Sequence, residues 1–433
     1  MRHLIILCLL LFNQSICRLT EKSQYDYSSY SAVKKNEDLS EQTITSTNSD
    51  ESAVYIDTSA TITKSNIIKE SGESSKTEDS EFYGVNAAVL VQGGTLTMTG
   101  GEITTKAKGA NALVATNEGT VTISGTSIIS TATGSGRGLH ATYGGKINGK
   151  SVTITTSGQS CASLATDRGE GEVTCNECSL TTNGKGSPII YSTGNIKVES
   201  SEGSANGAQA VVIEGKNTAE IKACHEFKCT ATPNRNDVDQ CGVMIYQSMS
   251  GDASPGLGKF ICTDSEIRII EASPYYKTAP MFFVTNTHAS IELTNCGFYY
   301  GSNTFLSVKA TNEWGRIGQN GGNATLYITN QFIEGNLEVD GNSYLTIKFI
   351  KSSIKGAINP NGTAKVLAID IDKDSKITLT GNSYYTSFVN ELQDGSNLIN
   401  GSYSWSKSGE NKNSAKIIQN LFWILLSLNV LLL

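Results

Sequence analysis

Hydrophobic and polar residues alternate in many short stretches of this chain. In Thr95–Thr99 (TLTMT) and Thr120–Ser124 (TVTIS), the apolar residues fall on one face of an extended strand and the Thr and Ser residues on the other. No stretch between such segments has the 3.6-residue periodicity of an amphipathic helix. The pattern therefore predicts an all-β fold and argues against βαβ units and helical leucine-rich repeats.

The alternating segments belong to an irregular repeat that opens on a glycine. Because strands this short are not stable alone, a repeat of this period indicates units that stack on one another. We therefore predict one parallel β-helix over residues 53–400, with roughly 13–14 coils of about 25 residues each. The alternative is a β-sandwich of hairpins, but two-residue Asn-Gly or Asp-Gly turns are mostly missing. The opening glycines are Gly84, Gly109, Gly136, Gly158, Gly186 and Gly207.

The N-terminus predicts entry into the secretory pathway. Residues 1–17 combine a basic start, a short apolar run and small residues before Arg18, which is typical of a cleaved signal peptide. Residues 18–52 are rich in Ser, Thr and Glu and have no apolar run, so we expect a flexible arm there.

The C-terminus predicts attachment to the outer face of the plasma membrane. Residues 417–433 are apolar and follow a polar linker at 401–416, which is the pattern of a glycosylphosphatidylinositol (GPI) anchor signal. Asn400 and Ser408 are the two candidate attachment residues. A single-pass transmembrane anchor is the alternative, although Gln419 and Asn420 shorten the apolar stretch.

Cysteines and glycosylation motifs agree with an extracellular location. Eight cysteines remain after the signal peptide, and an even number in a secreted chain predicts disulfides, mostly within a coil or between neighbouring coils. A zinc or redox role for the CxxC pair is the alternative. The cysteines are Cys161, Cys175, Cys178, Cys224, Cys229, Cys241, Cys262 and Cys296. Candidate N-glycosylation sites are Asn323, Asn361 and Asn400.

Charge and histidine content narrow the function classes. The net charge of −7 gives no electrostatic reason to expect a nucleic-acid partner. The whole chain contains four histidines, which leaves few residues for histidine-based catalysis or for binding zinc.

Several segments of the repeat have a recognisable form: GVNAAVLV (84–91), GLHATYGG (138–145), LATDRGEGEVT (164–174) and GSPIIYSTGNI (186–196). They resemble segments of secreted right-handed parallel β-helix proteins of the pectin-lyase-like superfamily, in particular adhesin-like surface proteins. The similarity covers roughly residues 84–380 and implies a right-handed helix. Because this fold also carries polysaccharide lyases and glycoside hydrolases, it does not decide the activity.

An enzymatic role has one candidate cluster. Hydrolases of this superfamily carry paired aspartates, a Gly-His-Gly motif and an Arg-Ile-Lys motif, none of which occurs here. Lyases need an acidic calcium site and a catalytic Arg or Lys, and the nearest match is Asp167, Arg168 and Glu170, with Arg137 and His140 expected one coil earlier on the same edge. The alternative is that these residues are solvated corner charges or a stacked ion pair.

One acidic segment is a candidate calcium site. Asp370, Asp372 and Asp374 imitate the start of an EF-hand loop, but Ser375 and Gly381 replace its required Gly and Glu. An outward row of acidic side chains is the alternative. No other cofactor is expected.

Together these features predict a GPI-anchored extracellular β-helix that acts as a non-catalytic adhesin or glycan-binding coat protein. Its partners would be the membrane, through the lipid anchor, and extracellular glycans or a neighbouring cell surface. A polysaccharide lyase or glycoside hydrolase of the pectin-lyase-like fold is the alternative. Aromatic residues that could stack on sugar rings include Tyr275, Tyr276, Tyr299, Tyr300 and Trp314.

Overall fold

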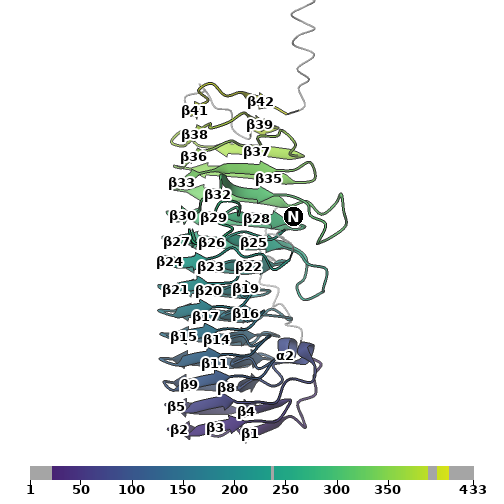
Figure 1. Ribbon diagram of the computed structural model, residues 1–433, viewed down its shortest axis with the longest axis vertical. Coiled ribbons are helices and arrows are strands. Elements are labelled where there is room, and N and C mark those ends of the chain that lie inside the picture. Colours follow the sequence, from purple (N-terminus) through teal and green to yellow (C-terminus); the bar gives the residue numbers. More distant parts are fainter. Residues whose placement is uncertain (1–21, 236–237, 389–396, 409–433) are drawn as a thin grey trace, which may run out of the picture.

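The computed structural model describes residues 22–235, 238–388 and 397–408. Within these residues the fold is all-β apart from α2 (Thr77–Tyr83), and every strand pair is parallel. Through most of the chain, each strand pairs with the strand three places before it and the strand three places after it, so three consecutive strands make one coil. The coils stack along the long axis of the molecule (Figure 1). This arrangement is consistent with a parallel β-helix and agrees with the all-β prediction.

The first long sheet, sheet A, takes the first strand of each coil. In the described residues it has 12 strands in the order β1 (Ser31–Lys35), β4 (Glu51–Ile56), β7 (Val89–Gln92), β10 (Leu113–Thr116), β13 (Leu139–Ala141), β16 (Leu164–Thr166), β19 (Ile190–Ser192), β22 (Val211–Glu214), β25 (Val243–Tyr246), β28 (Phe282–Thr285), β31 (Thr304–Val308) and β34 (Asn336–Val339).

Sheet B takes the second strand of each coil. Its 14 strands, again within the described part of the chain, are β2 (Leu39–Ser40), β5 (Ser59–Thr63), β8 (Thr95–Thr99), β11 (Thr120–Ser124), β14 (Lys146–Lys150), β17 (Glu172–Asn176), β20 (Asn195–Glu199), β23 (Thr218–Lys222), β26 (Leu257–Thr263), β29 (His288–Thr294), β32 (Asn323–Thr329), β35 (Tyr344–Ile350), β37 (Val366–Ile371) and β40 (Ser387–Phe388).

Sheet C completes the coils and is followed by two short sheets. Its strands are β3 (Thr43–Ser46), β6 (Asn66–Lys69), β9 (Glu102–Thr105), β12 (Ser127–Ser130), β15 (Thr153–Thr156), β18 (Ser179–Thr182), β21 (Glu202–Ala205), β24 (Glu226–Cys229), β27 (Glu266–Ile269) and β30 (Gly297–Tyr299). A four-stranded sheet joins β33 (Phe332–Glu334), β36 (Ser353–Lys355), β38 (Lys376–Thr378) and β41 (Leu398–Ile399). A final pair joins β39 (Ser383–Tyr385) and β42 (Trp405–Lys407).

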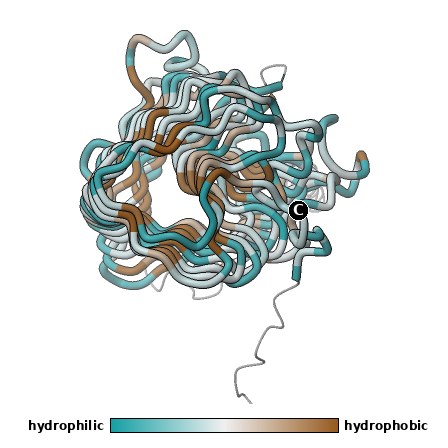
Figure 2. The backbone as a smooth tube through the Cα atoms, turned by 90° about the horizontal axis from the view of Figure 1, so that it is seen from below, coloured by the Kyte–Doolittle hydropathy of each residue, from teal (hydrophilic) through white to brown (hydrophobic). Residues whose placement is uncertain are grey.

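The core consists of inward side chains that repeat at the same place in successive coils. Ile123 of β11 stands in register with Met98 of β8 and Gly149 of β14, and it is fully buried. One continuous cluster of buried apolar residues extends from Leu39 to Leu379. Hydrophobic segments accordingly recur at the same positions around the stacked coils in Figure 2. Each coil therefore buries its apolar residues against the coil before it and the coil after it.

The expected flexible arm at 18–52 is wrong for most of its described part, because strands begin at Ser31 and belong to the first coil. Ile44 of β3 and Leu39 of β2 are buried, and both strands pair with the following coil. Tyr30 is buried, and its hydroxyl lies 2.8 Å from the Ser52 hydroxyl. These apolar residues are single and separated by long polar stretches, so the sequence pattern alone does not reveal the coil that they belong to.

The expected linker at 401–416 is also partly structured. β42 lies inside it and pairs with β39, and Trp405 stacks on Tyr385 with ring centroids 5.1 Å apart. Residues 409–416, the signal peptide and the apolar tail lie outside the described residues. No helix in the described part of the chain is long and apolar enough to cross a membrane.

Sheet A differs from sheet B because both of its faces are buried. Strands of sheet B, such as β8, alternate between exposed and buried residues, as the sequence pattern predicts. In β10 and β22 of sheet A, all four residues are buried. Helix α2 and longer loops lie on the outer side of this sheet (Figure 1). The outward residues of sheet A therefore form a second, covered column, which runs through Leu90, Val114, His140, Ala165, Tyr191, Val212, Met244 and Phe283.

The cysteines follow the prediction only in part. Cys175 and Cys178 are joined in a disulfide, whereas the other six of the eight are buried and unbridged: Cys161, Cys224, Cys229, Cys241, Cys262 and Cys296. Cys224 and Cys262 do not occupy equivalent positions of their coils, because Cys262 pairs with Ile221 in the neighbouring strand. The thiols of Cys262 and Cys296 are nevertheless 2.9 Å apart.

Cys224 has a different role at the corner between sheets B and C. Its sulfur accepts a hydrogen bond from the Ser201 amide, and its own amide donates to the hydroxyl of Ser265. The corner residues of successive coils thus form a ladder in which each side chain accepts from the backbone of the previous coil. Cys224 stands in this ladder between two serines, so the equivalent residues of the adjacent coils offer no cysteine for a bridge.

The inward and outward positions of β11 can be tested by substitution. Ile123→Asp should lower the free energy of unfolding by at least about 3 kcal/mol, because it places an unpaired charge inside the stack. Thr122→Asp, at the adjacent exposed position, should change it by less than about 1 kcal/mol. Urea denaturation measures both. Equal effects of the two substitutions would contradict the observed register.

Candidate functional site

The outer face of sheet A carries a cavity of about 550 Å³. Three members of the covered column contribute to it: Tyr191, Val212 and Met244, from three successive strands. The rest of its lining comes from other residues of the coils, among them Arg137, Asp167 and Glu214, from α2, and from loop residues at 234–235, 239, 248–250, 252 and 313–314. Because those segments cross the outside of the coils, they enclose a space that a bare β-helix face would leave open.

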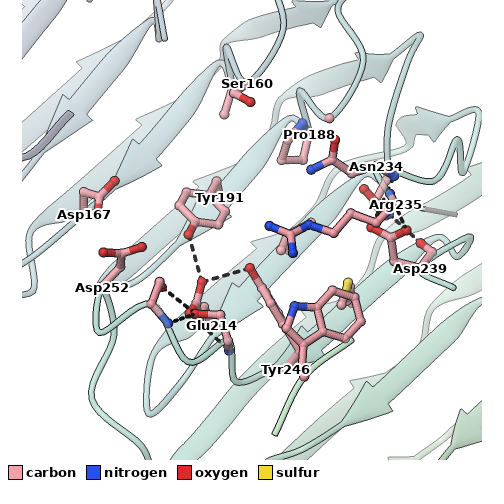
Figure 3. Close-up of a pocket in the computed structure, with 18 of the residues that line it drawn as sticks. Ser160, Asp167, Pro188, Tyr191, Glu214, Asn234, Arg235, Asp239, Tyr246 and Asp252 are labelled. Atoms are coloured by element: carbon pink, nitrogen blue, oxygen red, sulfur yellow. Dashed lines mark hydrogen bonds between the residues drawn. The ribbon is translucent and has the colours of Figure 1, made fainter. Parts of the chain in front are cut away.

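Glu214 is the buried carboxylate at the centre of this cavity. The side chain is 1% exposed, and it accepts hydrogen bonds from the hydroxyls of Tyr191 and Tyr246, both at 2.9 Å. Its other oxygen accepts from the amide of Ser248 at 3.2 Å. Figure 3 shows the two phenols converging on this carboxylate from neighbouring strands. Among the described residues, no Lys, Arg or His side chain forms an ion pair with Glu214.

Aromatic rings surround this carboxylate. Tyr246 packs edge-on against Trp314, with ring centroids 5.1 Å apart. Burial raises the pKa of Tyr191 and of Tyr246 well above the usual value, and the charge of Glu214 raises them further. Both hydroxyls therefore stay protonated at physiological pH and act as donors to Glu214.

A second group of charges lies at the α2 side of the cavity. Arg137 is buried and forms ion pairs with Asp167 at 3.2 Å and with Glu81 of α2 at 3.6 Å. Burial raises the pKa of Asp167 to about 7, although Arg137 opposes the shift; the nearby charges of Asp252 and Glu81 add to it. Several carboxylates thus compete for one guanidinium, so Asp167 can hold a proton near neutral pH.

His140 lies in the covered column but does not line the cavity. It is fully buried, and neither ring nitrogen has a hydrogen-bond partner in the described structure. Burial lowers the pKa of His140 well below its ordinary value, and the charge of Arg137 lowers it further. His140 is therefore neutral.

The five residues predicted from the sequence as a binding cluster are divided by the structure. Arg137 and Asp167 pair with each other and line the cavity, and His140 is packed nearby. Arg168 lies 3.8 Å from the centre of the Phe82 ring and pairs with Asp252 at 3.4 Å. It lines a second, open depression of about 1040 Å³ together with Glu170.

Glu170 pairs with Lys216 at 2.5 Å, so this end of the predicted cluster belongs to an ion pair at the edge of the coils. Exposed ion pairs of this kind are common structural features of a surface. The solvated-corner interpretation therefore fits Arg168 and Glu170 better than it fits Arg137 and Asp167.

Sequence reasoning missed the central residues of the cavity. Tyr191 and Glu214 lie in segments whose sequence does not alternate regularly between apolar and polar residues. Of the five aromatic residues named as candidates for stacking on sugar rings, only Trp314 lines this cavity. One signal was present: Glu214 ends the run Val211–Glu214, and a charge is unexpected in a strand that is otherwise apolar on both faces. The sequence does not show which loop residues line the cavity, because their position depends on how the chain folds.

The candidate calcium residues are divided between a strand and the turn that follows it. Asp370 lies in β37, whereas Asp372 and Asp374 lie in the following turn. Asp372 accepts a hydrogen bond from the Lys351 amide at 2.9 Å. Across residues 22–235, 238–388 and 397–408, no group of three or more His, Cys, Asp and Glu side chains is arranged to hold a metal ion. Only Asp370 of the three therefore lies in a strand, so the three carboxylates do not form one outward row on a strand.

The predicted glycosylation and anchor residues lie at the surface in the described region. Asn323 begins β32, and Asn361 and Asn400 lie in turns; all three are exposed. Ser408, which follows β42, is partly buried. The three asparagines are accessible to modification, and their glycosylation remains a prediction.

Searches against models of known protein families, curated proteins and solved structures find no match. Membership of the pectin-lyase-like superfamily therefore remains a prediction. Function must be inferred from the arrangement of side chains in the cavity.

Replacing His140 tests whether this buried histidine lowers the stability of the fold. His140→Leu should raise the free energy of unfolding by about 1 kcal/mol near pH 7.5, because it removes two buried nitrogens without partners. The difference in the free energy of unfolding between His140→Leu and the wild type should be larger near pH 5. There the unfolded histidine binds a proton that the folded one, with its lowered pKa, does not bind, so the wild type loses stability as the pH falls.

Urea denaturation at the two pH values measures the effect. The exposed His225→Leu is the control and should change stability by less than about 0.5 kcal/mol at both pH values. A loss of stability in His140→Leu at both pH values would show that His140 makes a stabilising interaction absent from the structure.

Proposed function

We propose that this chain is a non-catalytic, glycan-binding protein of the cell surface, an adhesin or coat protein. Its body would be a single right-handed parallel β-helix of roughly 13–14 coils, related to the pectin-lyase-like superfamily. The observation that carries the proposal is the cavity on sheet A. It combines aromatic rings with fixed hydrogen-bonding groups, which is the combination that recognises sugar rings and their hydroxyls.

The position of the cavity on a stacked scaffold supports a binding role. Tyr191 and Val212 are held at adjacent positions of paired strands, and Trp314 is brought to them by a loop. Loops carried on a rigid scaffold commonly form binding sites. Such a site keeps its shape without the ligand, which favours recognition of an extended surface polymer.

A polysaccharide lyase or glycoside hydrolase is the second candidate function, and one observation favours it. Burial raises the pKa of Asp167 to about 7, so it can donate a proton near neutral pH, and a second carboxyl group, that of Glu214, lines the same cavity. General acid–base cleavage of a glycosidic bond requires two carboxyl groups, one of which donates a proton. The glycan array described below therefore also tests the enzymatic alternative.

For the anchor, the strand pairing favours Ser408 over Asn400 as the attachment residue. Cleavage after Asn400 would remove β42 and expose Tyr385, whose ring stacks on Trp405. Cleavage after Ser408 would leave this pair intact. The chain would then leave its last coil directly at the membrane, with the cavity farther from the bilayer.

A glycan array tests the binding function. The full chain, purified in detergent, should bind a subset of glycans saturably, with and without calcium, and release no products. New reducing ends or unsaturated products would support the enzymatic alternative. The absence of binding to any glycan would contradict the proposal.

Enzymatic release tests the anchor. Phosphatidylinositol-specific phospholipase C should release the protein from intact cells, because a GPI anchor is held only by its lipid. Immunoblotting of the medium measures the release. Retention on the cells, together with an intact C-terminal tail in mass spectrometry, would indicate a single-pass anchor instead.

A further inference from the structure

Glu214 is a buried carboxylate whose hydrogen-bond donors are all neutral. Two phenol hydroxyls and one amide bond to it, but in the described part of the chain it has no cationic partner. Burying a carboxylate without a counter-charge is costly, even where hydrogen bonds offset part of the cost. The residue faces a cavity large enough for a ligand, so a cationic group of the ligand can supply the missing charge.

The aromatic rings around Glu214 also favour a cationic group of the ligand. Tyr191, Tyr246 and Trp314 all line the cavity. The faces of aromatic rings attract cations, and ammonium groups are commonly held by several rings beside a carboxylate. An anionic sugar would instead meet the charge of Glu214 at close range.

The remaining charges of the lining point in the same direction. Six carboxyl groups line the cavity, against two guanidinium groups, those of Arg137 and Arg235. Asp167 can hold a proton near neutral pH, Asp252 is paired with Arg168, and Arg137 is paired with Asp167 and Glu81, so negative charge remains in excess. Excess negative charge in a recessed site attracts cationic ligands and repels polyuronates. The six are Glu81, Asp167, Glu214, Asp239, Asp252 and Glu313.

We propose that this cavity recognises a glycan that carries free ammonium groups, that is, a polymer containing unacetylated 2-amino sugars, with Glu214 as the partner of one ammonium. The inference rests on the proposed glycan-binding function and names its ligand class. The cavity also offers hydroxyl and amide side chains, including Ser160, Asn234 and Ser250, for sugar hydroxyls. A lysine side chain has no hydroxyls to use them, which favours an amino sugar over a basic peptide.

Titration calorimetry on the full chain in detergent tests this assignment. The probes are a glucosamine tetramer, an N-acetylglucosamine tetramer, a galacturonate tetramer and a lysine tetrapeptide, each at mildly acidic pH where the amines are protonated. The glucosamine tetramer should bind at least about tenfold more tightly than the other three. Its affinity should fall with added salt, because a charge pair contributes to binding.

Two variants and a control assign the effect to the cavity. Glu214→Gln keeps the shape of the side chain and should weaken binding of the glucosamine tetramer at least about tenfold. Glu313→Gln, at a partly exposed part of the lining, should weaken it a few-fold without affecting the fold. The control Glu199→Gln removes an equal charge from the outer face of sheet B, where Glu199 pairs with Lys222, and should leave binding unchanged.

Several outcomes would overturn the assignment. Equal affinity for the glucosamine and N-acetylglucosamine tetramers would refute the ammonium requirement but leave the proposed glycan binding in place. Tight binding of the lysine tetrapeptide, weakened by Glu214→Gln, would assign the site to a basic peptide. If Glu214→Gln proves unstable, unchanged binding by a folded Glu313→Gln would also contradict the proposal. A positive glycan array without binding of glucosamine would refute only this inference.

Discussion

Every coil of this protein depends on its neighbours for both hydrogen bonds and apolar burial. The strands are three to seven residues long in most coils, which is too short for a stable sheet by itself. Parallel pairing brings equivalent residues of adjacent coils about 4.8 Å apart, so like side chains stack in columns. The column of Met98 and Ile123 is one consequence, and the corner ladder through Ser201, Cys224 and Ser265 is another. A change at one inward position is therefore felt in two further coils.

Stacking also decides where a binding site can be built. Sheet B keeps a polar outer face, whereas the outer face of sheet A is apolar and must be covered. Helix α2 and the loops after β24, β25 and β31 leave the coil path on this side. Because they do not cover the sheet uniformly, a cavity remains between them. The site thus arises where insertions meet the regular scaffold, as is common for repeat folds.

The charges enclosed by these insertions are unusual for a structural core. Arg137 and Asp167 form a buried pair, and replacing such a pair by apolar residues is often neutral or stabilising. Glu214 is buried beside phenols that could have been phenylalanines. Buried charges that stability does not require are commonly found at functional sites. This reasoning links the electrostatics of the cavity to binding more firmly than either its size or its aromatic content does.

The sequence by itself determined the all-β class and the alternation of sheet B, because period-2 alternation with one polar face is a local property of each strand. It also indicated Arg137 and Asp167, because they are the nearest match to the acidic site and the catalytic Arg or Lys that the resemblance to lyases implies. The sequence did not predict the strands within residues 22–52, because single buried residues such as Ile44 produce no periodic pattern.

Only the tertiary structure decided the register of the cysteines, the double burial of sheet A and the grouping of Tyr191, Glu214, Tyr246 and Trp314. Insertions of different length shift the repeat, so spacing along the chain does not give the position within a coil. The cavity residues lie far apart in sequence, and they meet because the stacked strands and their covering loops bring them to one face.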